Sequence, residues 1–498
     1  QLIDIYHHIC QTFDYKQYAC MVFSDISKAF DRVWHRGLLF KLQEHGIQGQ
    51  LLNWISNYLT NRFQKVTLRS SVSEAKRVTA VIPQGSVLGP LMFLIYVNDI
   101  SSSLLSITRL FADDSLLFTS TSSLNDIEGI LNHDLNIVSL WAKTWLVNFN
   151  PNKTEAMLFS LNNTNILPKL TFENTDIKFV DSHKHLGVTF NSKGKWVDHI
   201  DTVLASASKT IGIMKKMKYQ LSRRALNQIY ISYVRPILEY SCIVWDGCSE
   251  ECAEKLEKMQ NEAARVVTGL TKSVSIERLY EECGWDHLAD RRKFQKLCFM
   301  YKVNSETVPS YILDLIPPSV GNVSHYPLRN NENIVIPYSR TVVSQKSCIP
   351  SSISLWNDLS VDMRNINSLN LFKTSARKLI QLACVPAYFL LGERCLQIIH
   401  ARLRNRCSNL NDDLFHNHLD QNRFCDCSGE VENAEHFFFE CQFYTDQRRI
   451  LLTSTHSFQP LNTQLLLRGS NNISNDENAI IFLAVQRYIK DTKRFKNN

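Results

Sequence analysis

Two adjacent carboxylates between two short apolar runs are the residues of this sequence best suited to chemistry. Asp113 and Asp114 belong to the string Phe111-Ala112-Asp113-Asp114, and apolar residues dominate on both sides, at 107–110 and 115–119. The pattern predicts two strands joined by a tight turn that carries both carboxylates. Neighbouring carboxylates repel each other and resist burial, and a divalent cation would relieve both effects. Taken alone, the pair also fits an ordinary solvated turn.

A further carboxylate follows a second apolar run upstream. Residues 18–23 form a continuous apolar run, as expected of a strand buried on both faces, and Asp25 ends it. The loop at 82–91 lies between the two acidic sites. Its Gly85 and Gly89 permit close backbone approach, and its Pro90 is well placed to open a helix. These segments together favour a cation site over a solvated turn.

Several elements would have to position these residues. We expect an apolar helix from about 91 to 98 beneath the sheet, a hairpin over 62–81 that leads into the loop, and an amphipathic helix over 131–145. The tryptophans of that last helix, Trp141 and Trp145, are interpreted as core residues rather than as nucleic-acid stacking platforms. From 197 to 297 the apolar spacing is helical throughout.

At this point the sequence resembles a known family. Asp25 with Phe30, the Pro83-Gln84-Gly85 loop and the 111–114 string resemble three successive motifs of reverse transcriptases. The fuller strings at 24–31 and 84–90 resemble those of jockey-like non-LTR retrotransposons. Residues 145–154 are similar to the next palm motif of the family, and residues 183–188 to its primer grip. The order and the spacing of the motifs also match.

The resemblance implies a role for each matched residue. Asp25 and Asp113 would bridge two Mg²⁺ (or Mn²⁺) ions, and Asp114 would complete the negative cluster. Phe30 would lie under the sugar of the incoming nucleotide and exclude a 2′-hydroxyl, with core packing as the alternative. Gln84 and Gly85 would shape the nucleotide and template pocket. Lys153 would contact phosphates or protonate pyrophosphate, unless it is a plain surface lysine.

Composition indicates an ordinary intracellular globular protein. The chain has 498 residues, 44% hydrophobic and 21% charged, so it is long enough for two to four domains with substantial cores. The sequence contains no run of about 18 apolar residues, which is the length that a membrane-spanning helix needs. The formal charge of +7 is consistent with a polyanionic partner, and the scattered 14 cysteines suggest reduced thiols. Only 24 residues precede Asp25, so we expect an N-terminally truncated chain from which the family's fingers region is largely missing.

A second chemical site is predicted near the end of the chain. Cys425, Cys427, His436 and Cys441 have the spacing C-x-C-x8-H-x4-C, which suits one tetrahedral Zn²⁺ ion in a structural site. It resembles the Cys-rich knuckle downstream of the polymerase in non-LTR elements. The alternative is a set of unrelated free residues. Basic residues at 402, 404 and 406 precede this site, and others follow a helical stripe at 215–224. Nucleic-acid contacts and solvated surfaces explain both groups equally well.

The expected fold is α+β. A polymerase palm, an antiparallel sheet with packed helices, would be followed by a helical thumb-like region and a small zinc-knuckle-like C-terminal module. The corresponding domains are 1–190 for the palm, 191–300 for the thumb-like region, 301–395 for a connecting region of unassigned role and 396–498 for the C-terminal region.

The resemblance implies an RNA-directed DNA polymerase that acts in retrotransposition. Its partners would be an RNA template, a DNA primer or target and dNTPs, without a membrane. Its location would be intracellular, in nucleus and cytoplasm as a ribonucleoprotein. One alternative is a weak or inactive nucleic-acid-binding remnant of a retroelement. Another is a different palm enzyme such as a nucleotide cyclase, against which the loop at 83–85 and the region of Lys184 argue.

Overall fold

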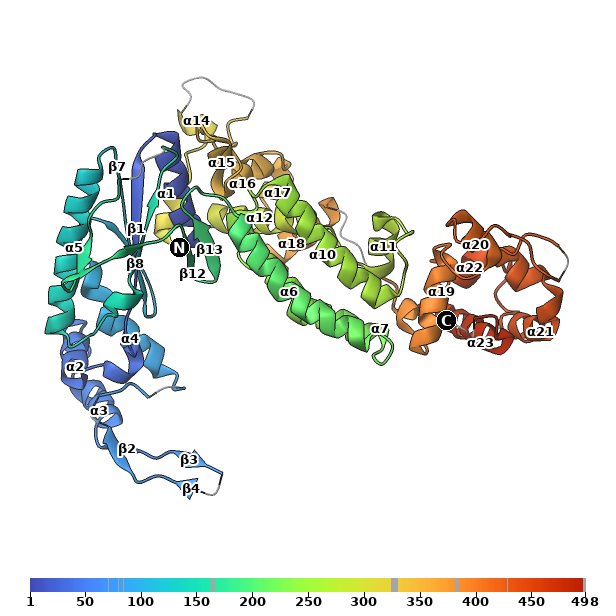
Figure 1. The fold of residues 1–498 in the computed structure, drawn as a ribbon, viewed down its shortest axis with the longest axis horizontal. Helices are drawn as coiled ribbons and strands as arrows, with labels where there is room; N and C mark the ends of the chain where they lie inside the picture. Colours follow the sequence, from blue (N-terminus) through green and yellow to red (C-terminus); the bar gives the residue numbers. More distant parts are fainter. Residues whose placement is uncertain are drawn as a thin grey trace. The chain divides into compact units, whose positions relative to one another are not determined.

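The chain divides into two compact units. The computed structural model describes residues 1–69, 71–78, 80–83, 85–162, 166–323, 330–380, 385–427 and 429–495. Unit 1 comprises residues 1–198 and 337–350, and unit 2 comprises residues 199–336 and 351–498. Both are drawn in Figure 1.

Unit 1 combines strands and helices, as expected for an α+β fold (Figure 1). Its helices are α1 (Leu2–Asp14), η1 (Ala29–Arg32), α2 (His35–Glu44), α3 (Gly49–Leu59), α4 (Leu88–Val97), η2 (Asn98–Ser101), α5 (Leu124–Thr144), η3 (Pro151–Lys153) and α15 (Val342–Gln345). Its strands are β1 (Tyr18–Asp25), β2 (Arg62–Gln64), β3 (Thr67–Leu68), β4 (Ser71–Val72), β5 (Lys76–Val78), β6 (Ile107–Phe111), β7 (Asp114–Thr121), β8 (Glu155–Phe159), β9 (Thr171–Phe172), β10 (Thr175–Asp176), β11 (Lys178–Phe179), β12 (Ser182–His185) and β13 (Val188–Asn191).

The central sheet of unit 1 has five strands in the order β11-β8-β1-β7-β6. β1 lies between β8 and β7 and is antiparallel to both, and β6 pairs with β7 through the predicted tight turn. The sheet is mixed rather than fully antiparallel, because β11 runs parallel to β8. The predicted strands at 18–23, 107–110 and 115–119 are therefore confirmed as β1, β6 and β7.

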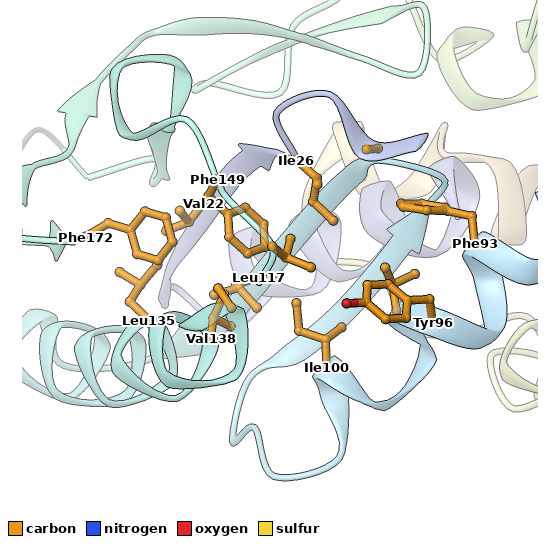
Figure 2. Packing of buried hydrophobic residues seen from close by; sticks show 14 of the residues in the cluster. Val22, Ile26, Phe93, Tyr96, Ile100, Leu117, Leu135, Val138, Phe149 and Phe172 are labelled. Carbon is orange, nitrogen blue, oxygen red and sulfur yellow. The ribbon is translucent and has the colours of Figure 1, made fainter. Parts of the chain in front are cut away.

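The core of unit 1 explains why the β1 sequence is apolar without alternation. Cys20 and Val22 belong to a buried cluster that α4 and α5 complete on one face of the sheet, whereas Met21 is buried outside this cluster, and α1 also packs on β1. Figure 2 shows part of this cluster, to which α4 contributes Phe93 and Tyr96, α5 contributes Leu135 and Val138, and the sheet contributes Val22 and Leu117. A strand covered on both faces reads as a continuous apolar run.

The helix α5 confirms the interpretation of its tryptophans as core residues. Trp141 and Trp145 pack against the buried cluster, and both rings also face the buried ammonium of Lys41. The ammonium lies 3.7 Å from the centre of the Trp145 ring and completes the contact with an ion pair to Asp99. These contacts join α2 to α5.

Two other predicted elements are present with shifted ends. The hairpin over 62–81 forms as β2–β5, with Ser70 and Thr79 outside the described residues. α4 begins at Leu88, three residues earlier than expected, so Pro90 lies inside its first turn. Backbone N–H groups in the first turn have no helical acceptor, so the N–H that proline lacks is not missed there.

A short return of the chain belongs to unit 1. At residues 337–350, the backbone N–H and the hydroxyl of Thr341 both donate to Asp14 Oδ1, at 2.7 and 2.8 Å. These bonds fix α15 against the end of α1. Sequence reasoning assigned no role to this segment.

Unit 2 is helical, which confirms the helical prediction for 197–297 (Figure 1). Its helices are α6 (Val197–Met217), α7 (Arg223–Ile229), η4 (Tyr230–Val234), α8 (Arg235–Glu239), α9 (Cys242–Trp245), α10 (Glu250–Thr268), α11 (Ile276–Cys283), α12 (Leu288–Asn304), α13 (Ser310–Leu313), α14 (Val320–Val323), α16 (Cys348–Asn357), α17 (Val361–Arg364), α18 (Leu369–Leu379), η5 (Ala387–Leu390), α19 (Arg394–Arg404), α20 (Asn411–His416), η6 (His436–Glu440), η7 (Gln442–Tyr444), α21 (Thr445–Ser454), α22 (Thr463–Arg468) and α23 (Asn475–Thr492). Among the described residues, no helix combines the length and the apolar character needed to cross a membrane.

Two arginines of unit 2 are buried, so for them both the nucleic-acid and the solvated-surface interpretations are wrong. Arg223 and Arg404 both face Glu282, with nitrogen–oxygen distances of 2.8 and 3.4 Å, and all three side chains are about 2% exposed. A buried carboxylate needs positive partners. These two arginines therefore neutralise the buried carboxylate of Glu282 and do not face solvent, where a phosphate backbone would bind.

Candidate active site

The three carboxylates predicted from the sequence lie at one end of the central sheet. Asp25 is the last residue of β1 and pairs in register with Asp114, the first residue of β7. Asp113 lies in the turn, and its carbonyl accepts a hydrogen bond from the Ile26 N–H at 3.1 Å. Directly opposite residues of an antiparallel pair place their side chains on the same face, about 5 Å apart at Cβ. The fold therefore brings together residues separated by almost ninety positions.

The turn itself holds an uncommon backbone conformation. Phe111 pairs with Asp114, so only Ala112 and Asp113 connect the two strands, and Ala112 has φ 54°. A left-handed conformation at a residue other than glycine costs of the order of 1 kcal/mol or more and persists where the surrounding structure imposes it. Here the paired strands impose the left-handed conformation of Ala112, and the turn therefore holds the two carboxylates in fixed positions.

Charge accumulates at this strand end. Burial raises the pKa of Asp114, and the negative charges of Asp113 and Asp25 raise it further, while His183 opposes them. Three carboxylates offer the hard oxygen ligands that Mg²⁺ and Mn²⁺ prefer, so the donor set fits these cations. Among the described residues, the ligand oxygens of Asp25, Asp113 and Asp114 do not all lie within 4.8 Å of one another.

Lys153 supplies a positive charge next to Asp25. Its ammonium lies 3.2 Å from Asp25 Oδ2, and its side chain is 66% exposed. The position follows from the backbone, because the Asn150 N–H donates to the Asp25 carbonyl at 3.2 Å and the Asn150 side chain caps the turn η3. Lys153 therefore reaches the carboxylates from a neighbouring loop. Sequence reasoning named Lys153 but did not foresee that it would contact Asp25.

Phe30, in the short helix η1 that follows β1, is a packing residue. Its ring lies 4.9 Å from that of Phe93 in α4 and packs against the buried cluster. The Phe30 carbonyl accepts a hydrogen bond from the Ile82 N–H at 2.9 Å, which joins the turn η1 to the loop that follows. The core-packing alternative is thus present in the structure. The ring remains partly exposed, so a second role is compatible with it.

The loop at 83–89 is held by its own polar contacts. The Ser86 hydroxyl donates to the Pro83 carbonyl at 2.8 Å and accepts from the Gly89 N–H at 3.0 Å. A Cβ on Gly89 would lie 3.1 Å from the Pro83 carbonyl oxygen, which confirms the close backbone approach expected there. Gly85 has φ 78°, a conformation that favours glycine. Gln84 lies outside the described residues.

The segment that resembles a primer grip is a hairpin beside the same strand end. His183 in β12 stacks on Phe23 of β1, with ring centres 3.9 Å apart, and its Nδ1 lies 2.8 Å from Glu155 of β8. Phe23 is two residues before Asp25 and shares its face of the sheet. Burial lowers the pKa of the neighbouring His185 to about 4, so that ring is neutral at physiological pH. Glu155 was missed from the sequence because only the sheet pairing reveals its partner.

The predicted cysteine and histidine site also forms. Cys425, Cys427, His436 and Cys441 converge so that their ligand atoms all lie within 4.8 Å of one another. The Cys425 and Cys441 sulfur atoms are 3.8 Å apart, and the Cys427 sulfur lies 3.2 Å from His436 Nε2. Two sulfur ligands about 2.3 Å from a tetrahedral zinc ion would themselves be about 3.8 Å apart. The group therefore fits zinc in chemistry and in spacing.

Two carboxylates next to His436 are also consistent with a zinc site. His436 Nδ1 points away from the sulfur atoms, 3.4 Å from a Glu430 oxygen and 3.6 Å from a Glu440 oxygen. A carboxylate behind the second ring nitrogen is the usual support of a metal-binding histidine. Burial raises the pKa of Cys425 and Cys441, so both keep their protons at neutral pH until a cation displaces them.

Comparisons with known proteins agree with the geometry of unit 1. Residues 3–190 match the family described as reverse transcriptase (RNA-dependent DNA polymerase). The chain is 28% identical over 276 residues to the probable RNA-directed DNA polymerase from transposon BS of Drosophila melanogaster, covering 52% of this chain and 30% of that protein. It is 27% identical over 281 residues to the RNA-directed DNA polymerase from mobile element jockey of the same organism, covering 54% of this chain and 30% of that protein.

These alignments are partial on both sides. The matched segment spans about a third of the length of the curated relatives. Among solved structures, an apo telomerase from Candida tropicalis aligns over 58% of this chain and 49% of its own, with a TM-score of 0.31 and 12% identity. A likeness this low supports no inference about the fold.

Proposed function

We propose that this chain, whose residues 3–190 match the reverse transcriptase family, is an RNA-directed DNA polymerase of a jockey-like non-LTR retrotransposon. The observation that carries the proposal is the register pair Asp25 and Asp114, with Asp113 in the adjoining turn, inside the matched segment. The reaction would add dNTPs to a primer 3′-hydroxyl under the direction of an RNA template.

Asp25, Asp113 and Asp114 would hold two Mg²⁺ or Mn²⁺ ions. When bound, the ions lower the pKa of the primer 3′-hydroxyl and stabilise the charge on the departing pyrophosphate. Lys153 supports this scheme because its ammonium already lies at Asp25. With its exposed ammonium, Lys153 would contact the phosphates or donate a proton to the leaving pyrophosphate.

The remaining residues would position the nucleotide and the primer. Phe30 would lie beneath the sugar of the incoming nucleotide and disfavour a 2′-hydroxyl, with Phe93 behind the ring as support. Gly85, together with Gln84, would shape the pocket for the nucleotide and the template. The hairpin at 183–188 would place the primer end, and His183 is anchored for this role by Phe23 and Glu155.

The other parts of the chain would serve the same reaction. We propose a palm at 1–190, a thumb-like region at 191–300, a connecting region at 301–395 and a C-terminal region at 396–498 in which Cys425, Cys427, His436 and Cys441 bind one structural Zn²⁺ ion. The partners would be the RNA template, a DNA primer or target and dNTPs. The location would be the nucleus and the cytoplasm, as a ribonucleoprotein.

Primer extension tests the proposal. The chain is incubated with an RNA template, an annealed DNA primer and dNTPs, with Mg²⁺ or with a chelator. We expect extension that requires the metal and that Asp113→Asn removes, whereas Asp176→Asn, an exposed control on β10, leaves it unchanged. Extension by Asp113→Asn at the parent rate would refute the assignment. RNA binding without any extension by the parent chain would favour the nucleic-acid-binding remnant.

A further inference from the structure

A two-stranded ribbon in unit 1 is exposed along nearly all of its described length. We call residues 62–69 and 71–78 the arm. Its strands pair as β2 with β5 and β3 with β4, and every described residue from 60 to 77 is exposed. Figure 1 shows the arm projecting beyond α3. A hairpin without a core of its own is marginally stable in water, so its exposed side chains call for a partner.

The arm carries a concentrated positive charge. It contains five cations and one carboxylate, Glu74, which leaves +4 of the chain's formal +7 (5 − 1 = 4). In the described part of the chain, none of the five is within ion-pair distance of a carboxylate. Arg62 and Arg77 donate instead to neutral oxygens, the Tyr58 carbonyl at 3.0 Å and the Asn61 side chain at 3.2 Å. Charge of this kind favours a polyanion. The five cations are Arg62, Lys65, Arg69, Lys76 and Arg77.

Aromatic rings accompany these cations. Phe63 is 65% exposed and pairs in register with Arg77, so the ring and the guanidinium share one face of the ribbon. On α3, at the base of the arm, the exposed Trp54 stacks on Tyr58 at an interplanar angle of 14°, and the Arg62 guanidinium lies 5.0 Å from the centre of the Tyr58 ring. Rings interleaved with cations are the means by which proteins hold unpaired bases.

We propose that the arm, together with Trp54 and Tyr58, binds a single-stranded segment of RNA. The charge favours nucleic acid over a protein partner, and the exposed rings favour an unpaired strand, since the bases of a duplex are already stacked on one another. The deep and narrow major groove of an RNA duplex does not admit such a ribbon. The surface is separate from the carboxylates of the candidate active site. Only the identification of the strand as a template rests on the proposed function.

Equilibrium binding of a labelled single-stranded RNA to the full chain tests this surface. The arm variant Lys65→Gln/Arg69→Gln/Lys76→Gln is compared with Lys143→Gln/Lys169→Gln/Lys178→Gln, which removes the same charge from exposed positions elsewhere in unit 1. We expect the arm variant to lose at least about tenfold in affinity at low salt. Its dependence of log affinity on log salt should be shallower by about 2, because each lost phosphate contact removes about 0.7 from the slope. The matched variant should show neither change.

A second pair of variants tests the stacking. Phe63→Leu should weaken single-stranded binding by about fivefold or more with an unchanged salt slope, because stacking on one base contributes about 1–3 kcal/mol. Phe40→Leu, an exposed ring on α2, is its control. A blunt RNA duplex should lose less affinity than the single strand in both arm variants.

The outcomes separate this proposal from the polymerase activity. An arm variant that binds single-stranded RNA as well as its matched control overturns the proposal, even if the chain extends primers normally. Equal losses for single strand and duplex overturn the assignment to unpaired RNA. The binding assay needs no nucleotide, so an arm effect in a chain that fails to extend primers supports the arm and counts only against the proposed function.

Discussion

Asp114 faces an electrostatic penalty that its neighbours create. Burial and the charges of Asp113 and Asp25 raise its pKa above the ordinary value of 3.8. A carboxyl group whose pKa is higher in the folded protein binds protons more readily when folded, so the free energy of unfolding decreases as the pH rises through that folded pKa. The charged cluster therefore weakens the metal-free protein at neutral pH.

We predict that Asp114→Asn raises the melting temperature of the metal-free protein at pH 7. The expected gain is small, about 1–2 °C, because the group is partly exposed and solvent screens it. It should shrink as the pH falls through the folded pKa of Asp114 and vanish below 3.8, where the parent carboxyl is also protonated. Millimolar Mg²⁺ should narrow the difference, because a cation stabilises the charged parent cluster.

Thermal melting over a pH series, with Asp176→Asn as the exposed control, measures this effect. A variant that melts below the parent at pH 7 without metal would show that Asp114 is held by favourable contacts instead of tolerated at a cost.

At the scale of elements, the strands were predictable and several helix ends were not. The apolar runs at 18–23 and 115–119 contain enough β-favouring residues to specify buried strands, and the Asp pair marks the turn between them. α4 begins before Pro90 because Ser86 and Gly89 tighten the preceding loop, a contact that no spacing rule contains. The parallel strand β11 is only two residues long and carries no sequence signal of its own.

Substitution of Gly89 tests whether the loop at 83–89 depends on close packing of its backbone. A methyl group there would press on the Pro83 carbonyl and the Ser86 hydroxyl, so Gly89→Ala should destabilise the loop by roughly 1–3 kcal/mol. Gly129→Ala is the matched control. It lies within α5 with nothing within 4 Å of an added Cβ, so the same change should stabilise its helix by up to about 1 kcal/mol.

Amide hydrogen exchange at residues 85–97 measures the local effect. Protection should fall in Gly89→Ala and stay unchanged in Gly129→Ala. Unaltered protection in Gly89→Ala would mean that the loop can open around the methyl group without loss.

At the scale of the whole molecule, the buried charges were the least predictable feature. Arg404 lies in an arginine-rich stretch that suggested nucleic-acid contacts, yet it faces Glu282 in the core of unit 2. The partner is more than a hundred residues away, so local pattern could not identify it. The cluster of Cys425, Cys427, His436 and Cys441 was predictable because its members lie within seventeen residues and their types and spacing suit a metal ion.

We predict that the purified, reduced chain contains about one equivalent of zinc. Cys427→Ser should lose the metal, because three ligands bind zinc more weakly than four, and should also loosen the C-terminal core, since His436 is followed directly by the buried Phe437 and Phe438. Cys395→Ser removes an exposed thiol outside the cluster and should retain both metal and stability. Elemental analysis and thermal melting report the two effects. A zinc-free parent protein would contradict the site.

We propose that carboxylates from β1 and from the β6–β7 turn form a single catalytic site. Extension of a DNA primer on an RNA template by Asp25→Asn, Asp113→Asn and the double variant tests it most directly. Groups that act as a unit are strongly non-additive. Each single variant should therefore slow extension by at least about a hundredfold, roughly 3 kcal/mol. The double variant should be no more than about threefold slower than the slower of the two single variants. A double variant whose loss equals the product of the two single losses would show that the two carboxylates act independently. A single variant that extends at the parent rate would show that its carboxylate is not catalytic.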